Sequence, residues 1–308
     1  MTTTSLERPA PAQIRLVRSE LLKIRTTNVW WIFLIVVFVA TALSLWIWMG
    51  TGAGQINEAE AAGNQPFVPS NPDATSFEIE AERQQWEISH SLTRTLVSVA
   101  ANIYTSGQFF GLLCVMLVGT ILVTNEYFHQ TATATFLTTP RRTEVIMGKL
   151  GTSVLAAVFF WLFTTVLSVA SGAIFFNSMG YGSQLDQWPV QRAILFNGLA
   201  YALWGVLGVG LGVLIRSQIA ATLVGSISYV IGTQVVQGLA FLLTFLLKAT
   251  WPLKVMVLWP ATASGVMISP EKPYPEAPDW WVGGLILLGY GILFGVIGTL
   301  IMRKRDIS

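Results

Sequence analysis

Residues 29–49 read VWWIFLIVVFVATALSLWIWM, an apolar run without a charged side chain. A helix of about 20 mostly apolar residues is long enough to cross the hydrocarbon core of a bilayer. Tryptophans stand near both ends of the run, which is typical of side chains at the membrane–water interface. The run is also longer than the apolar part of a secretory signal peptide, which has about 7–15 residues. It therefore predicts a retained transmembrane helix.

Five further segments have a similar length and composition. They are residues 105–124, 150–176, 193–215, 219–247 and 281–302. Continuous apolar runs of this kind favour helices, because the strands of a membrane β-barrel alternate apolar and polar residues over about ten positions. The sequence predicts an all-α polytopic membrane protein, with a six-helix transmembrane domain over residues 29–308.

The composition argues against a soluble enzyme, a nucleic-acid-binding protein and a disordered scaffold. Of the 308 residues, 53% are hydrophobic and 11% are charged, whereas a soluble domain carries about 25% charged residues. The formal net charge of +2 is too small to indicate a nucleic-acid partner. The single cysteine, Cys114, excludes an internal disulfide, and cysteine and histidine together are too few for a structural zinc site. The expected surroundings are membrane lipid.

Basic residues predict the orientation of the six spans. The segments on the side of the two termini hold 12 of the 18 Lys and Arg residues and have a net charge of +7. The segments on the opposite side have a net charge of −5. Because basic loops stay in the cytoplasm, we expect both the N-terminus and the C-terminus to be cytoplasmic.

Residues 1–28 form a cytoplasmic segment in this topology. Between residues 13 and 25, apolar side chains recur at helical spacing, at Ile14, Val17, Leu21 and Ile24. Charged side chains fall mostly on the other side of that helix, at Arg15, Arg18, Glu20, Lys23 and Arg25. This pattern predicts an amphipathic helix that lies in the membrane interface. The alternative is a basic flank that only sets the orientation.

Two outer segments interrupt the spans. The outer loop 50–104 begins with Gly, Ala, Asn and Pro residues, which suit irregular structure, and is expected to be helical from about residue 75. Its glutamates are expected to form a solvated face rather than a metal or cationic-substrate site. Residues 248–280 are apolar at first but are interrupted by Pro252 and Pro260. An outer re-entrant or interfacial pair of short helices fits this segment best.

Polar and small residues inside the spans have two interpretations. Asn197, Gln234 and Gln237 could line a substrate path, although hydrogen bonding between helices is the commoner role of such side chains. Two GxxxG pairs favour close helix packing. These pairs are Gly208 with Gly212, and Gly291 with Gly295.

The cores of the predicted spans contain no Asp, Glu, Lys, Arg or His. Ion-coupled carriers and intramembrane enzymes depend on such groups, so this absence disfavours both classes. Gly148 and Lys149 are followed by Leu150, without the upstream glycine of a nucleotide-binding Walker sequence. We therefore expect no catalytic, cofactor or metal site in this chain, and any nucleotide must bind a separate subunit.

The inner loop, residues 125–149, is the most informative connection and reads NEYFHQTATATFLTTPRRTEVIMGK. An acid, Glu126, follows the second predicted span in a low-dielectric region where an unpaired carboxylate is costly. We expect Glu126 to pair with a basic or backbone donor, and Arg25, Arg141 and Arg142 are the basic candidates. Phe136 and Leu137 offer an apolar contact in a short surface helix that Pro140 would end.

This loop resembles that of the permeases of ABC transporters in the type-2 exporter class. The matching residues are Glu126, Thr131, Leu137, Pro140, Arg141, Arg142 and Lys149. His129 and Gln130 replace the basic residue and glycine that are usual in the family. The segment RSELLKIRTTNVWW, residues 18–31, is also similar to the family's N-terminal helix.

The resemblance implies a second permease protomer, identical or related, and two ATPase subunits that bind ATP and magnesium. It implies that loop 125–149 is the coupling helix that docks on the ATPase, with Phe136 and Leu137 at the contact. Arg141 and Arg142 could instead serve only the membrane topology. The function expected from it is export of an amphipathic substrate, such as a drug, a peptide antibiotic or a lipid, across a bacterial plasma membrane. The alternatives are an ion-coupled carrier or channel, and a membrane-embedded lipid-modifying enzyme.

Overall fold

The computed structural model describes residues 12–26, 29–63, 67–71, 76–89, 91–130, 142–274 and 276–304, and this part of the chain is helical, without strands. The first helices are α1 (Ala12–Thr26), α2 (Val29–Gly63), α3 (Ser76–Ser89), α4 (Leu92–Tyr104) and α5 (Gln108–Phe128). The long central helices are α7 (Arg142–Ser178) and α8 (Trp188–Leu214). They are followed by α9 (Gln218–Ile227), a π-helical turn (Ser228–Gly232) and α10 (Thr233–Leu247). The last are α11 (Trp251–Val255), a 3₁₀ turn (Met256–Leu258), α12 (Pro260–Ile268) and α13 (Trp280–Lys304).

Six helical segments of the described chain are long and apolar enough to cross a membrane, which confirms the predicted number of spans. The segments are Trp30–Gly63, Leu92–Phe128, Thr143–Ser178, Trp188–Leu214, Gln218–Leu247 and Trp280–Ile301. The second consists of α4 and α5, separated by a turn whose Gly107 has a φ of +82°. The protein is therefore an all-α multi-pass membrane protein.

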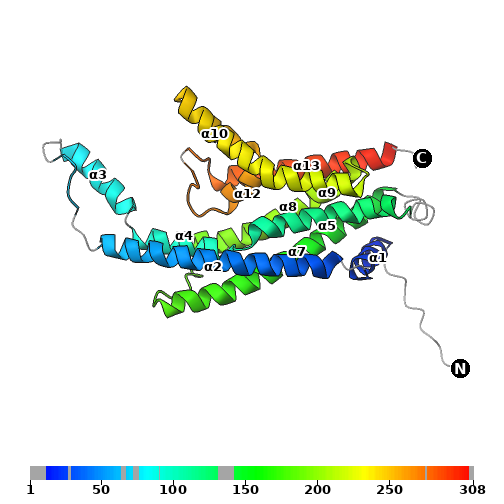
Figure 1. Cartoon of the computed structure of the whole chain (residues 1–308), viewed down its shortest axis with the longest axis horizontal. Helices are drawn as coiled ribbons and strands as arrows, with labels where there is room; N and C mark the ends of the chain where they lie inside the picture. Colours follow the sequence, from blue (N-terminus) through cyan, green and yellow to red (C-terminus); the bar gives the residue numbers. More distant parts are fainter. Residues whose placement is uncertain are drawn as a thin grey trace.

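The termini of the long helices lie at two opposite ends of the molecule (Figure 1). Helix α1, the beginning of α2, the end of α5 and the end of α13 lie at one end. Helices α3 and α12 lie toward the other end. This is the arrangement that six successive crossings require.

Helix α8 is at the centre of the bundle and contacts α5, α7 and α13. A Cβ atom on Gly208 would lie 2.0 Å from the carbonyl oxygen of Met116, and one on Gly212 would lie 2.7 Å from that of Thr120. Glycines at both positions therefore let α8 approach the backbone of α5. On the side of α13, a Cβ on Gly291 would lie 2.9 Å from Leu203, whereas one on Gly295 would have an ordinary contact of 3.9 Å with Val206.

The outer loop differs from its prediction at its beginning. Residues 50–63 continue α2 as a regular helix, so the expectation of irregular structure there was wrong. The reason is tertiary packing: Ile56 is fully buried, and a Cβ on Gly52 would lie 2.5 Å from Val99 of α4. Packing of this kind overrides the low helix propensity of glycine.

Short helices occupy the other outer segment. Helices α11 and α12 each have proline in the first turn, where its missing N–H costs no helical hydrogen bond. Arg192 of α8 donates a hydrogen bond of 2.7 Å to the carbonyl oxygen of Ser269, at the end of α12. Its guanidinium also lies 5.0 Å from the ring centre of Trp280, at the start of α13. The depth of this segment in the membrane stays a prediction.

Candidate functional site

Four charged side chains from three separate helices form one cluster. They are Glu20 and Lys23 of α1, Glu126 of α5 and Lys149 of α7. The Lys23 Nζ atom lies 2.7 Å from Glu20 Oε1 and 3.0 Å from Glu126 Oε1. The Lys149 Nζ atom lies 3.3 Å from Glu20 Oε2 and 2.9 Å from Glu126 Oε1. Two carboxylates and two ammonium groups thus neutralise one another, and we call this set the ion cluster.

The ion cluster is largely removed from solvent. The Lys149 side chain is 0% exposed, and the Glu20 and Glu126 side chains are 5% and 6% exposed. Lys149 Nζ also donates a hydrogen bond of 2.8 Å to the carbonyl oxygen of Leu122. Its three N–H donors therefore have three acceptors, as a buried ammonium group requires.

Lys23 is the half-exposed member of the ion cluster, with 47% of its side chain accessible. Burial by itself lowers the pKa of its ammonium group, but the hydrogen bonds and charges of Glu20 and Glu126 outweigh that effect and raise the pKa above 10.5. Lys23 is consequently protonated throughout the physiological range. Lys23 and Lys149 together balance the charges of the two buried carboxylates, Glu20 and Glu126.

The ion cluster depends on a close approach of α1 to α7. A Cβ on Gly148 would lie 3.2 Å from the Cβ of Leu16, and one on Gly151 would lie 3.5 Å from a methyl group of Val17. Two glycines one turn apart thus form the surface of α7 that receives α1. Lys149 lies between them and points at the acids of α1 and α5.

One expectation about the charged residues was wrong, and another was met by residues that were not among its named candidates. Glu20 was expected on the solvated side of the N-terminal helix, but it is 4% exposed and faces α7. Glu126 was expected to pair with a basic or backbone donor, and it has two basic partners among the described residues, Lys23 and Lys149; the side chains of the candidates Arg141 and Arg142 lie outside those residues. An ion pair needs only a nearby opposite charge, and the sequence could not show that the fold places the two lysines on either side of this carboxylate.

The other residues predicted for the N-terminal helix and the inner loop are either outside the ion cluster or outside the described residues. Arg18 and Arg25 are exposed on α1, and the side chain of Arg15 lies outside the described residues. Arg142 begins α7, but its side chain is likewise outside them. The remaining loop residues lie in the segment 131–141, outside the described structure: Thr131, Phe136, Leu137, Pro140 and Arg141. Their assignment to ATPase coupling stays a prediction.

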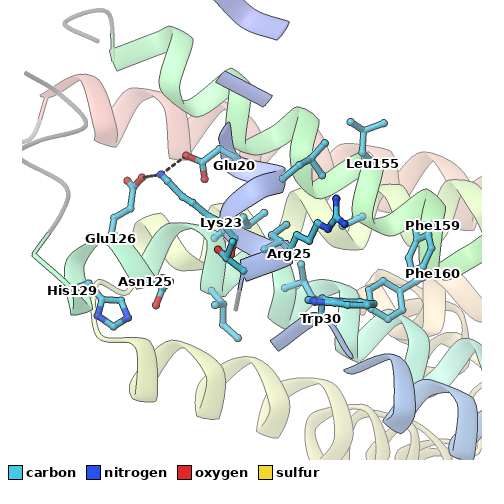
Figure 2. A pocket seen from close by; sticks show the side chains of 17 residues that line it. Glu20, Lys23, Arg25, Trp30, Asn125, Glu126, His129, Leu155, Phe159 and Phe160 are labelled. Carbon is cyan, nitrogen blue, oxygen red and sulfur yellow. Dashed lines mark hydrogen bonds and ion pairs between the residues drawn. The ribbon is translucent and has the colours of Figure 1, made fainter. Parts of the chain in front are cut away.

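A cavity of about 740 Å³ adjoins the ion cluster between α1, α2, α5 and α7 (Figure 2). Lys23, Glu126 and His129 line its polar part. Trp30 and Phe160 belong to its apolar part. We call this space the α1 cavity.

A larger cavity of about 1070 Å³ lies between α2, the turn joining α4 to α5, α10 and α12. Gln237 lines it, but neither Gln234 nor Asn197 does. Gln234 is exposed on α10, and Asn197 is buried in α8 with no hydrogen-bond partner for Oδ1 among the described residues. The three polar residues proposed for one path therefore do not converge on this cavity.

The part of the chain that the structure describes contains no group of three or more His, Cys, Asp and Glu side chains that could hold a metal ion. The ion cluster itself consists of ion pairs between helices. Fold and site together define a helical membrane protein whose N-terminal helix is ion-paired to the two helices that flank residues 129–141. The chain belongs to the family DUF2705, described as "Protein of unknown function", which matches residues 75–308. No curated protein matches the chain significantly.

Proposed function

We propose that this chain is the membrane-spanning permease subunit of an ATP-driven exporter of the ABC type-2 class, powered by a separate ATPase subunit. The observation that carries the proposal is the ion cluster. It joins the N-terminal helix to α5 and α7, the two helices that flank residues 129–141. The predicted loop 125–149, whose residues resemble a coupling helix, therefore includes the end of α5 and the first two turns of α7. The motif residues at the two ends of that loop, Glu126 and Lys149, are in direct contact at 2.9 Å.

The proposed mechanism follows from this connection. ATP and magnesium bind the partner ATPase, and closure of the ATPase dimer pushes on the loop. Because Glu126 and Lys149 also bind Glu20 and Lys23, the push is transmitted to α5, α7 and α1 together. Oppositely charged groups in a low-dielectric region resist separation, so the three helices move as one body. The movement shifts the bundle between inward- and outward-facing states.

The larger cavity supports an amphipathic substrate. Its apolar lining includes Ile35, Phe110 and Phe241, and its polar lining includes Asn102 and Gln237. A pocket with a mainly apolar lining and a few polar groups is typical of sites for organic molecules of drug size. Drugs, peptide antibiotics and lipids all have this chemistry.

Exposed apolar faces support a second permease protomer. Large apolar side chains cover the outer faces of α2 and α10, among them Ile35, Leu43, Leu239 and Phe241. Three of these, Ile35, Leu43 and Phe241, also line the larger cavity. A second protomer against these helices would enclose the cavity between two copies. In the proposed assembly the complex resides in a bacterial plasma membrane, with both termini in the cytoplasm.

Purification of the tagged full-length chain from its native membrane tests the proposal. The expected result is a stoichiometric partner that contains a Walker A sequence, together with ATP turnover by the complex and none by the isolated chain. Flux that follows a pH gradient without ATP would favour an ion-coupled carrier. Chemical conversion of a lipid by the isolated chain would favour a membrane-embedded enzyme. Either result would contradict the permease assignment.

A further inference from the structure

The α1 cavity changes in polarity along its length. Polar side chains line it at the level of α1, among them Lys23 of α1 and Glu126 and His129 at the end of α5. Its apolar side chains on the same helix, Val118 and Ile121, lie further into the span. Eight residues of helix separate Val118 from Glu126, which is a depth of about 12 Å at 1.5 Å per residue. The cavity therefore extends from the level of α1 into the apolar part of the bundle.

Among the described residues that line the cavity, Arg25 is a cation outside the ion cluster. The four members of the ion cluster neutralise one another. Arg25 also lines the cavity, is exposed, and has no carboxylate within ion-pair distance among the described residues. Figure 2 shows its side chain between Lys23 and the aromatic rings of Phe159 and Phe160. A guanidinium in this position suits a phosphate group, because its planar N–H donors match the phosphate oxygens.

The apolar wall of the cavity reaches the outer surface of the bundle. Leu155 and Phe159 of α7 line the cavity and are 49% and 50% exposed. In a membrane, this face of α7 meets the acyl chains of the surrounding lipid. Trp30, at the start of α2, also lines the cavity, and tryptophan prefers the level of the lipid headgroups. The cavity thus has a polar end at the headgroup level and an apolar end at the acyl-chain level.

We propose that the α1 cavity binds an anionic phospholipid, whose phosphate pairs with Arg25 and one of whose acyl chains lies against Val118, Leu155 and Phe160. The volume of about 740 Å³ lies within the range of about 300–1,000 Å³ that is usual for small-molecule sites. The lipid is a resident ligand that supports α1 against α7. The proposal is independent of the proposed transport function, because the cavity is separate from the larger cavity assigned to the substrate.

Quenching of Trp30 fluorescence tests the proposal. The detergent-purified full-length chain is titrated with phosphatidylglycerol that carries bromine on its acyl chains, and with equally brominated phosphatidylcholine. The Trp30 signal is the difference between the wild type and the Trp30→Phe variant. We expect saturable quenching by phosphatidylglycerol, with about tenfold weaker binding of phosphatidylcholine, because the choline cation of the latter offsets the phosphate charge that Arg25 would bind.

Substitutions in the α1 cavity test whether the lipid binds there. Arg25→Gln should weaken the binding of phosphatidylglycerol about tenfold, and Ala156→Phe should abolish it by filling the cavity. The matched control is Lys254→Gln, which removes an exposed basic group of α11 outside the cavity and should leave binding unchanged. Native mass spectrometry of the wild type supplies a readout without a variant: phosphatidylglycerol should remain bound at collision energies that remove phosphatidylcholine.

Three results of the lipid measurements would overturn the proposal, and so would one result of a competition experiment. They are equal quenching by the two lipids, unchanged quenching in a folded Ala156→Phe variant, and equal retention of both lipids in the mass spectrometer. Glycerol phosphate serves as a soluble competitor. Complete displacement of the lipid by it would show that the site binds a free phosphate, which also contradicts a lipid site.

Discussion

Replacing Lys149 by methionine removes a fully buried ammonium group and keeps a side chain of similar length. The change leaves Glu20 and Glu126, both about 5% exposed, with Lys23 as their remaining partner in the ion cluster. It also leaves the carbonyl oxygen of Leu122 without its hydrogen bond from Lys149. Breaking a buried ion pair from one side costs about 3–5 kcal/mol, since the opposite charge stays buried without compensation. We expect a loss of this size in the free energy of unfolding.

The assay is reversible unfolding of the full-length chain in mixed micelles, followed by circular dichroism. The matched control is Lys254→Met, which breaks the pair with Glu276 at 3.1 Å, where both side chains are about half exposed. Exposed pairs contribute about 0–1 kcal/mol, so this control should unfold nearly as the wild type does. A double-mutant cycle with Glu20→Gln isolates the coupling between the acid of α1 and Lys149. A loss below about 1 kcal/mol for Lys149→Met would refute the reasoning, because the ion cluster would then contribute no more than a surface pair.

Further predictions concern packing, pH and topology. Gly208→Ala should destabilise the protein by about 1–3 kcal/mol, because the new Cβ would lie 2.0 Å from a backbone oxygen of α5. Gly238→Ala is the control, because open space surrounds that position and the added methyl group should cost little. Equal unfolding free energies for the two variants would contradict the described packing of α8 on α5. Because the pKa of Lys23 is raised above 10.5, its stabilising effect relative to Lys23→Met should persist below pH 10.5 and disappear as the pH rises beyond that value. An effect lost already near neutral pH would refute this assignment. A cysteine at Ser76 should react with an impermeant reagent in intact cells, and labelling only after permeabilisation would contradict the orientation.

Much of the fold could be predicted because membrane spans depend on length and apolarity alone. The run at residues 29–49 predicted a transmembrane helix, and α2 contains it. The extension of α2 to Gly63 was missed because the glycines at positions 50, 52 and 54 indicate a loop, although the alanine, glutamate and glutamine of residues 55–62 favour a helix. The extension depends on contacts with α4, such as that between Gly52 and Val99, which are distant in sequence.

The ion cluster was predicted only in part. The cost of a buried carboxylate indicated that Glu126 needs a basic partner, and the structure supplies two lysines. The burial of Glu20 was missed because charges on an amphipathic helix indicate its solvated face. One signal in the sequence could have indicated it: Glu20 is four residues from both Leu16 and Ile24, so it shares a helix face with two apolar side chains.

Under the proposed function, residues 125–149 couple a separate ATPase to movement of this bundle. The most direct test measures substrate efflux alongside ATP turnover in proteoliposomes that contain the assembled complex. The variant combines Glu126→Ala with charge reversal at Arg141 and Arg142, and the remaining basic residues keep its topology. We predict that efflux falls while the basal ATP turnover of the complex persists or rises. Normal efflux by this triple variant would contradict the account and would show that the loop is only a topological flank.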